Sequence, residues 1–350
     1  MIFGSDNQAG ASETVLEGMM DAYRQSAPAY GRDPLCHAAV EKLKETFDTD
    51  LSAFFVISGT AANTLALSAL VKPWEGVICD HQAHILMDES SAPSTATGGA
   101  TLLPIPSDEA RISLSAFEAH FEQLPKNYPH NVRPAALSLS QANEVGQVYS
   151  VDDVKGLVGS AKERGLRVHM DGARFANAVA ALACHPADIS WRAGVDVLCL
   201  GATKNGAVAA EAVIFFDKEL AKDFQFRIKR SGHLVSKGRL FGAQFLSWLE
   251  EDHWLDLARS ANRTAEALRQ SLATLPGVRL AFPTQSNELF AIVPKALFKK
   301  LTGAGATLFP WPLHALPHTV KVSDDEMLVR LVTSFATTDE EVAAFIAAAD

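Results

Sequence analysis

Short apolar runs alternate with amphipathic, helix-like segments along most of the chain from about residue 53 onward. The apolar runs cover residues 53–58, 76–79, 101–105, 135–140, 166–170, 196–200 and 212–216. Strands that alternate with helices are typical of a mostly parallel sheet, because parallel strands need crossover connections. The pattern therefore predicts an α/β protein whose sheet is flanked by helices.

Two helix starts are legible from capping residues. Ser150 precedes Asp153 by three positions, and Thr338 precedes Glu341 by the same spacing. A hydroxyl followed by an acidic residue at this distance satisfies free backbone N–H groups at the beginning of a helix. We expect helices to begin directly after Ser150 and Thr338.

The alternation stops near residues 231–233, and a single long helical pattern follows from about 239 to 275. After it come strand-like runs at 278–282, 289–293 and 328–332, and a final helix that reaches residue 349. We predict a large domain over residues 1–238, with an N-terminal arm of about residues 1–20. A smaller α+β domain is predicted over residues 239–350.

The composition and charge of the chain indicate which kinds of partner it is expected not to bind. The chain has 350 residues and a formal net charge of -10. Binding to nucleic acid or to an anionic membrane needs clustered Lys and Arg, so neither partner is expected. The first ten residues lack a basic leader, and no apolar run approaches the length that crosses a bilayer. The four cysteines lie far apart in sequence and predict reduced thiols, and hence a cytoplasmic protein.

Two neighbouring strand ends carry the residues with the clearest chemistry. Asp171 ends one apolar run, and Lys204 lies in a turn of small residues after the next run. A carboxylate can keep a pyridinium nitrogen protonated, and a lysine amine can form a Schiff base with an aldehyde. The pair predicts a pyridoxal phosphate (PLP) site. Alternatively, Asp171 caps a helix and Lys204 is a solvated loop residue.

A phosphate site is predicted where a strand meets the helix that follows it. Gly59 permits a tight turn, and the Thr60 hydroxyl and the first helical N–H groups would point at an anion. Thr203, directly before Lys204, could donate to the same phosphate. A plain strand-to-helix turn is the alternative.

His84 follows another strand, where its imidazole could lie over an aromatic cofactor and reach a substrate hydroxyl. His81 and His84, with Asp88 and Glu89, could instead be metal ligands. The chain has no H-E-x-x-H pattern or cysteine pair that would support this, so we predict no metal site.

Arg330 is a charge within an apolar strand-like run, where an unpaired charge would be costly to bury. It therefore needs an anionic partner, either a substrate carboxylate or an acidic residue of the other domain. Arg174, three residues beyond Asp171, could contact the cofactor or the same carboxylate.

Together these segments resemble the low-specificity threonine aldolases, which belong to the aspartate-aminotransferase-like (fold type I) PLP enzymes. The resemblance extends over nearly the whole chain. It rests on the order and spacing of segments 5–7, 30–34, 59–63, 83–84, 171–174, 203–206 and 330–334.

The resemblance implies a role for each matching position. Lys204 would bind the cofactor covalently, Asp171 would pair with the ring nitrogen, and His84 would stack on the ring. Further residues fall into three groups: Gly59, Thr60 and Thr203 at the phosphate; Ser5, Arg174 and Arg330 at the substrate carboxylate; Lys229, Arg230, Tyr30 and Arg32 at an active site shared with a second subunit. A homodimer with shared sites, and a homotetramer of such dimers, follow from the resemblance.

One segment departs from the family. Many members have a histidine in an Asn-Thr-His segment tied to the substrate hydroxyl, whereas this chain has Ser140-Gln141-Ala142-Asn143-Glu144. Asn143, placed at the substrate, cannot act as a base near neutral pH. We therefore expect His84, or a water that it positions, to take the β-hydroxyl proton, with Glu89 as an alternative.

The implied activity is cleavage of β-hydroxy-α-amino acids such as threonine, allo-threonine and phenylserine to glycine and an aldehyde. Another PLP reaction on the same fold, β-elimination or transamination, is the nearest alternative. Serine hydroxymethyl transfer and a non-catalytic PLP-binding protein are further alternatives. A nicotinamide-binding protein would need a G-x-G-x-x-G turn after an early strand, which the chain lacks.

Overall fold

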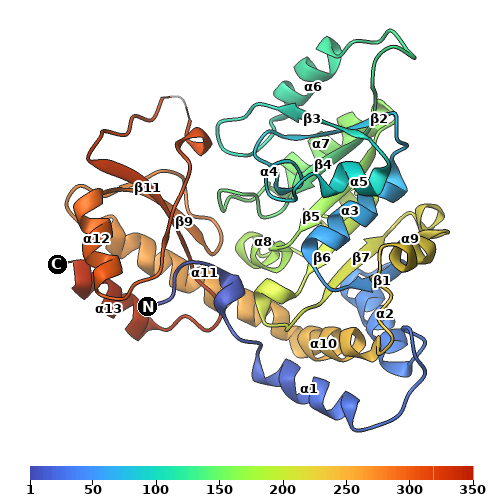
Figure 1. Cartoon of the computed structure of the whole chain (residues 1–350), viewed down its shortest axis with the longest axis horizontal. Coiled ribbons are helices and arrows are strands. Elements are labelled where there is room, and N and C mark those ends of the chain that lie inside the picture. Colours follow the sequence, from blue (N-terminus) through green and yellow to red (C-terminus); the bar gives the residue numbers. More distant parts are fainter. Residues whose placement is uncertain (318, 350) are drawn as a thin grey trace.

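A seven-stranded, mostly parallel sheet forms the centre of the larger part of the molecule in this computed structural model, which describes residues 1–317 and 319–349 (Figure 1). Its strands are β1 (Ser52–Val56), β2 (Glu75–Asp80), β3 (Thr101–Ile105), β4 (Arg133–Ser140), β5 (Arg167–Gly172), β6 (Val197–Gly201) and β7 (Glu211–Phe215). The order is β1-β7-β6-β5-β4-β2-β3, and only β7 runs antiparallel to its neighbours. The predicted α/β fold is confirmed.

Alternating side chains of the strands serve two cores on the two faces of the sheet. Leu198 and Leu200 of β6 belong to one core, whereas Val197 and Cys199 belong to the other. The first face is covered mainly by α2, α7, α8 and α10, and the second by α3 and α9. Because both faces are buried, the strands read as continuous apolar runs.

The helices and 3-10 turns connect the strands in the order expected from the sequence. The α-helices are α1 (Glu13–Tyr23), α2 (Pro34–Phe47), α3 (Gly59–Leu70), α4 (His84–Met87), α5 (Ala92–Thr97), α6 (Leu114–Gln123), α7 (Val151–Glu163), α8 (Phe175–Leu182), α9 (Phe224–Arg230), α10 (Arg239–Leu249), α11 (His253–Leu272), α12 (Lys295–Gly303) and α13 (Asp339–Ala349). The 3-10 turns are η1 (Asp6–Gln8), η2 (Trp191–Ala193), η3 (Thr203–Asn205), η4 (Lys218–Ala221), η5 (Glu250–Asp252) and η6 (Leu313–Ala315).

Both predicted helix starts are confirmed. Ser150 and Asp153 form a reciprocal capping box at α7. At α13, the Thr338 hydroxyl accepts from the N–H of Glu341, whose carboxylate accepts from the N–H of Thr338.

The single helix predicted for residues 239–275 is wrong, because the structure breaks it into α10 and α11. Glu251 and Asp252, between the two helices, adopt left-handed φ angles of 47° and 59°. The break lets α10 pack on α1 and α2 while α11 packs on α8 and reaches α13. The hydrophobic period is the same on both sides of the break, so it did not reveal the change of direction.

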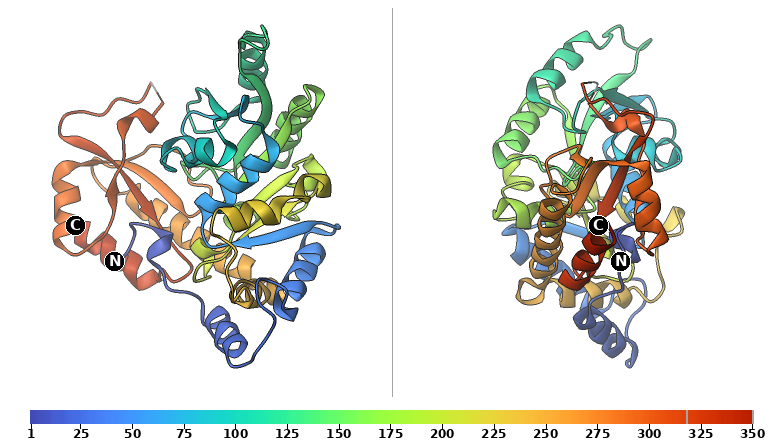
Figure 2. Two further views of the ribbon diagram at one scale, coloured as in Figure 1. Left: turned by 45° about the vertical axis from the view of Figure 1, so that its right-hand side comes forward. Right: turned by 90° about the vertical axis from the view of Figure 1, so that its left-hand side faces the viewer.

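A second, four-stranded antiparallel sheet lies beside the first (Figure 2, left view, orange to red). Its strands are β8 (Arg279–Leu280), β9 (Glu288–Pro294), β10 (Phe309–Pro310) and β11 (Glu326–Val332), in the order β10-β11-β9-β8. Helices α11, α12 and α13 supply the apolar side chains that cover it. The chain start reaches this sheet, since Phe3 is fully buried in the same core. The predicted domain boundary between residues 238 and 239 stays a prediction.

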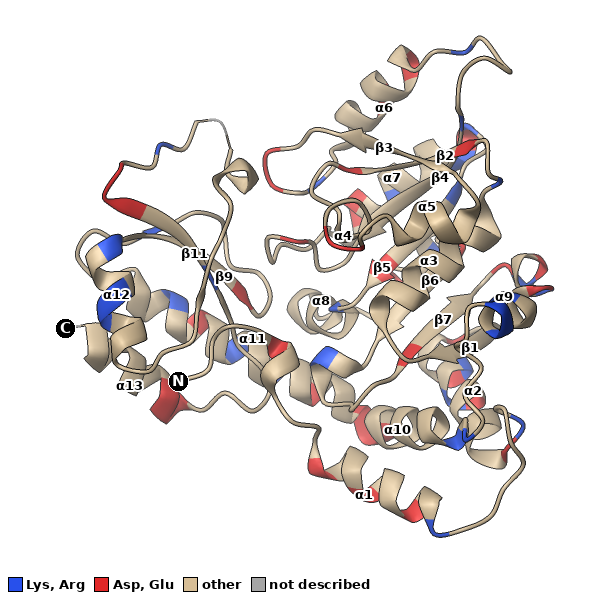
Figure 3. Cartoon of the chain, in the orientation of Figure 1, with Lys and Arg blue, Asp and Glu red and all other residues tan. Residues whose placement is uncertain are grey.

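Basic and acidic residues are interspersed along the ribbon of both parts of the molecule (Figure 3). Within the described residues, no helix combines the length and the apolar character needed to cross a bilayer.

Candidate active site

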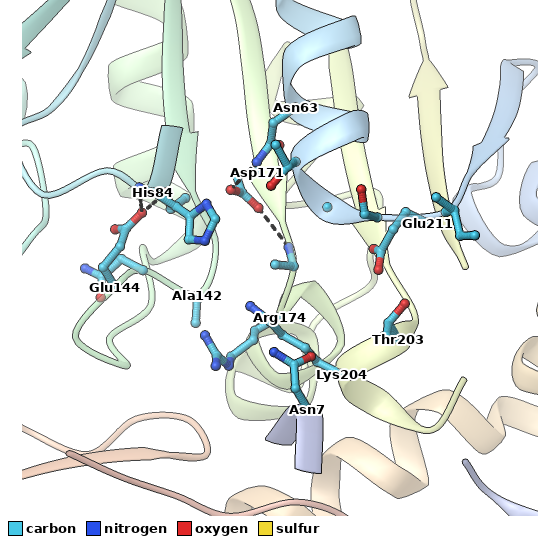
Figure 4. Close-up of a pocket in the computed structure, with 17 residues that line it drawn as sticks. Asn7, Asn63, His84, Ala142, Glu144, Asp171, Arg174, Thr203, Lys204 and Glu211 are labelled. Carbon is cyan, nitrogen blue, oxygen red and sulfur yellow. Dashed lines mark hydrogen bonds between the residues drawn. The ribbon is translucent and has the colours of Figure 1, made fainter. Parts of the chain in front are cut away.

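The carboxyl ends of β5 and β6 and the amino end of α3 surround a cavity of about 300 Å³ (Figure 4). Chain segments far apart in sequence meet here because parallel strands end at the same edge of a sheet. The predicted site residues that line this cavity are Gly59, Thr60, His84, Asn143, Asp171, Arg174, Thr203 and Lys204.

Asp171, on β5, holds its carboxylate in a fixed position at one side of the cavity. One oxygen accepts from Asn63 Nδ2 at 2.7 Å, and the other accepts from the N–H of Ala173 at 3.0 Å. Burial raises the pKa of Asp171, but the charge of His84, the Ala173 N–H and other nearby positive charges together lower it below its ordinary value. Asp171 is therefore an oriented carboxylate that favours its ionised form.

The amino end of α3 forms the opposite part of the wall. Ser58 caps the helix, with its hydroxyl accepting from the N–H of Ala61 at 3.3 Å. A Cβ atom added to Gly59 would meet no heavy atom within 4 Å, so the space beside the backbone there is open. Free N–H groups at a helix start, together with the helix dipole, attract an anion. The arrangement suits a phosphate.

Lys204 lies in η3, directly after β6, where Thr203 shapes the turn. The Thr203 hydroxyl accepts from the N–H of Ala210 at 3.0 Å and so closes the loop between them. Among the residues that the structure describes, no group forms a hydrogen bond or an ion pair with Lys204 Nζ. The amine therefore faces the cavity without a protein partner.

His84 and Asp171 belong to one hydrogen-bonded network built on a residue that the sequence interpretation missed. Asn63, on α3, donates through Nδ2 both to Asp171 and to Glu89 Oε1, the latter at 3.0 Å. Glu89 Oε1 also lies 2.9 Å from His84 Nδ1, and this hydrogen bond raises the pKa of His84. His84, Glu89 and Asp171 thus bring possible metal-ligand atoms within 4.8 Å of one another. Hydrogen bonds from the Asn63 amide and the His84 imidazole hold these groups together and account for their proximity.

Arg174 occupies a buried cluster of charges between the two sheets. Its Nε and Nη2 donate to the two carboxylate oxygens of Asp6 at 2.7 and 3.0 Å, and its Nη1 lies 3.0 Å from Glu288 Oε2. Although burial raises the pKa of Asp6, the charge and hydrogen bonds of Arg174 outweigh it and hold that pKa below its ordinary value. The cluster ties the chain start, the large sheet and β9 together.

Arg330 borders the same cluster from β11. Its guanidinium lies 4.4 Å from the centre of the Trp311 ring, and its Nη1 is 3.7 Å from Glu288 Oε1. The structure thus provides an acidic residue for Arg330, but Glu288 lies on β9 of the same small sheet and not in the other predicted domain. Contact with a substrate carboxylate stays a prediction for both arginines.

Replacing Asp6 with asparagine is expected to lower the free energy of unfolding by about 3 kcal/mol, because it leaves the buried Arg174 short of one charged partner. Urea unfolding followed by circular dichroism measures the change. The matched control is Asp21→Asn, since Asp21 pairs with Arg24 at the same 2.7 Å distance on the surface. The control should change stability by less than about 1 kcal/mol. Equal effects of the two substitutions would contradict a structural role for the Asp6 pair.

The remaining predicted residues do not line this cavity. Ser5 caps η1, and its neighbour Asn7 reaches the cavity instead. Tyr30 borders a separate cavity and carries Lys229 over its ring, with Nζ 5.8 Å from the ring centre. Arg32 and Arg230 also lie outside the main cavity lining. A role in a partner's site stays a prediction for Tyr30, Arg32, Lys229 and Arg230, and so does a contact of Ser5 with the substrate carboxylate.

Asn143 has all its hydrogen-bonding groups engaged by nearby backbone. Its Nδ2 donates to the carbonyl groups of Glu109 and Ala110, while its Oδ1 accepts from the N–H groups of Val145 and Gln147. This leaves no group free for the substrate contact predicted for Asn143. The side chain holds the loop after β4 in shape.

Two further carboxylates of the cavity were missed in the sequence. Glu144 follows Asn143, and Glu211 begins β7 after a turn of small residues. Burial is the main cause that raises the pKa of each to about 7. An acidic residue at the edge of an apolar run was the available signal, but it equally describes a solvated strand end.

Residues 3–295 match the Beta-eliminating lyase family. A low specificity L-threonine aldolase of Pseudomonas aeruginosa is 40% identical over 304 residues, which make up 87% of each of the two chains. The chain belongs to the low-specificity threonine aldolases of that family. The resemblance predicted from its motifs is confirmed.

Solved structures agree with membership of the threonine aldolases. The threonine aldolase of Leishmania major superposes with a TM-score of 0.92 at 28% identity, covering 99% of this chain and 98% of that one. A serine palmitoyltransferase of Sphingomonas wittichii has a TM-score of 0.73 at 16% identity, over 100% of this chain and 86% of that one. The second likeness shows the fold alone.

Pyridoxal phosphate, the cofactor of these enzymes, fits the groups that this threonine aldolase family member provides. The fixed Asp171 carboxylate suits the ring nitrogen, the unpartnered Lys204 amine suits the aldehyde, and the open start of α3 suits the phosphate. Each group lies at a different part of one cavity wall, as a cofactor with a ring nitrogen, an aldehyde and a phosphate requires.

Proposed function

We propose that this protein is a PLP-dependent aldolase that cleaves β-hydroxy-α-amino acids to glycine and an aldehyde. Threonine, allo-threonine and phenylserine are the proposed substrates. The observation that carries the proposal is one cavity that holds an ionised Asp171, the free amine of Lys204 and an anion-binding helix start. Identity of 40% to a low specificity L-threonine aldolase supports the choice of substrate.

The roles of the cavity residues follow from their chemistry. Lys204 would hold the cofactor covalently, Asp171 would keep its ring nitrogen protonated, and His84 would lie against its ring. Gly59, Thr60 and Thr203 would bind the phosphate. When bound, the cofactor supplies an electron-accepting ring that stabilises the negative charge left on the α-carbon.

The protein must also choose which bond of the substrate breaks. Arg174 and Arg330 would hold the substrate carboxylate and turn the Cα–Cβ bond toward the reactive orientation. Asp6 and Glu288 hold these arginines in place, so the substrate meets guanidinium groups whose positions are already set. Fixed positions lower the entropic cost of reaching the reactive geometry.

Incubation of the purified enzyme with threonine is expected to release glycine and acetaldehyde in equal amounts. Chromatography of amino acids and an aldehyde-specific assay measure the two products. The matching family is named for β-elimination, and elimination from threonine would instead give 2-oxobutanoate and ammonia. Those products, or an amino-group transfer without glycine, would overturn the aldolase proposal in favour of the alternatives.

We also propose that two chains form a homodimer with shared active sites, and that dimers pair into a homotetramer. Exposed Tyr30, Ile57 and Phe226, which are 50%, 44% and 71% exposed, support a contact surface. Light scattering that gives the mass of a single chain would contradict the proposed oligomer.

The described cysteines are all free thiols, which supports a reducing compartment such as the cytoplasm. Fractionation of cells that places the protein in an oxidising compartment would exclude this.

A further inference from the structure

Glu144 lies in the loop after β4 and contributes to the wall of the cavity beside His84 (Figure 4). The segment that contains it was expected to supply Asn143 to the substrate, but the backbone engages that amide fully. Glu144 is therefore the residue of this loop whose side chain can still take part in chemistry.

The two carboxylate oxygens of Glu144 have different surroundings. Oε1 accepts from Ser140 Oγ at 2.6 Å and from the backbone N–H of His84 at 2.9 Å. Oε2 is covered and has no hydrogen-bond partner among the described residues. A covered carboxylate oxygen without a partner is costly unless it binds a proton or a ligand. One oxygen thus fixes the side chain, and within the described part of the chain the other has no partner that would satisfy its charge.

Burial and nearby charges bring the pKa of Glu144 to about 7. Burial first, and then the negative charge of Asp171, raise its pKa to about 7 in spite of the hydrogen bonds from Ser140 and His84. The other ionisable groups of the cavity wall are His84, Lys204, Arg174 and Glu211. On the sheet side, burial is the main cause that raises the pKa of Cys79 and of Tyr149, and the Glu144 charge adds to both. A proton-transfer group works best when its pKa lies near the working pH.

Other acids and bases of the cavity are less suited to receive a proton. Asp171 is ionised, but two hydrogen bonds occupy it and its pKa is lowered. The hydrogen bond that His84 donates to Glu89 raises the pKa of His84 and favours the protonated imidazole, which cannot accept a proton. Glu211 has a pKa raised to about 7 as well, but it lies across the cavity beside Thr203, at the proposed phosphate end (Figure 4).

We propose that Glu144 accepts the proton of the substrate's β-hydroxyl group during Cα–Cβ cleavage. This inference rests on the proposed aldolase function. The O–H bond breaks and its proton goes to the Glu144 carboxylate, while the electron pair of that bond forms the C=O of the aldehyde. The Cα–Cβ bond breaks, its electron pair stays with the α-carbon, and a proton then replaces Cβ to give glycine. His84 keeps its place against the cofactor ring.

The test is Glu144→Gln in the holoenzyme, because glutamine keeps an oxygen for Ser140 and His84 but cannot accept the proton. We expect kcat for threonine cleavage to fall by about 100-fold or more. The wild-type rate should rise with pH through an apparent pKa near 7, and this acidic limb should be absent in the variant. Cofactor absorbance should be unchanged.

Exchange of the α-hydrogen of glycine in deuterated water, followed by NMR, separates a catalytic role from a structural one. Glycine has no β-hydroxyl group, so its exchange should be the same in wild type and in Glu144→Gln. Equal losses of exchange and of cleavage would overturn the proposal, as would an unchanged acidic limb. A wild type that exchanges glycine but does not cleave threonine would refute the aldolase function itself.

Two further measurements do not require the Glu144→Gln variant to cleave threonine. Burial of Glu144 raises its pKa from an ordinary 4.5 to about 7, so the folded state holds a proton that the unfolded chain has already lost. Cofactor-free wild type should therefore lose thermal stability relative to Glu144→Gln as pH rises from 4.5 to 7. If Glu144→Gln does not fold, Glu144→Asp should fold, retain the acidic limb and turn over more slowly. A pH-independent difference in stability, or loss of the acidic limb in the Asp variant, would contradict the assignment.

Discussion

Lys204→Ala is expected to lower kcat for threonine cleavage by at least about 10⁴-fold, because the amine that would bind the cofactor covalently is removed. The purified variant should also lose the visible absorbance of the bound cofactor. Spectroscopy of the protein and the aldehyde assay measure the two effects. The large size of the effect follows because, among the residues that the structure describes, no other lysine lines the cavity.

Lys155→Ala is the matched control for this experiment. Lys155 is exposed on α7, away from the cavity. Its loss should change neither absorbance nor turnover. Turnover that survives in Lys204→Ala would show that another residue binds the cofactor, and the proposed arrangement of the site would be wrong.

Asp171→Asn is expected to reduce kcat by roughly 10³-fold, since an amide cannot stabilise a protonated ring nitrogen. The loss should be constant above the acidic limb of the rate, and that limb should move to lower pH because the Asp171 charge no longer helps to raise the pKa of Glu144. Asp171 has a lowered pKa, so its carboxylate is ionised across neutral pH and titrates only under acidic conditions. Initial rates measured over a pH series test both points.

An exposed aspartate provides the control for Asp171. Asp256 pairs with Arg259 on the surface of α11, and Asp256→Asn should leave kcat unchanged. Cofactor titration distinguishes a chemical defect from weak binding. A variant of Asp171 that binds the cofactor and turns over at the wild-type rate would remove the carboxylate from the mechanism.

The class of the large sheet, mostly parallel and flanked by helices, could be predicted from the sequence because its signals are local. Fully buried strands such as β5 and β6 are apolar along their length, and capping residues such as Ser150 act within one turn. The direction of β7 was not readable, because an apolar run looks the same in a parallel and an antiparallel neighbour. The break between α10 and α11 was missed for a similar reason, since only the packing partners of the two helices differ.

Some residues of the candidate site could likewise be predicted from the sequence, and others could not. Asp171, Lys204 and Gly59 could be named because each lies at the end of a strand or the start of a helix, and such positions meet at one sheet edge. Asn63 could not be assigned, because its partners Asp171 and Glu89 come from other elements. The roles of Asn143 and Glu144 depend on which of two adjacent side chains the loop turns inward.

Local residue patterns therefore established the fold class and the family, and they predicted the principal cofactor residues. Tertiary structure decided the charge cluster of Asp6, Arg174 and Glu288, the network through Asn63 and the placement of Glu144. These features join residues as far apart as Asp6 and Glu288, and burial together with the charge of Arg174 then sets their charge states. The sequence specifies which groups are present, but their distances and their removal from water exist only in the folded chain.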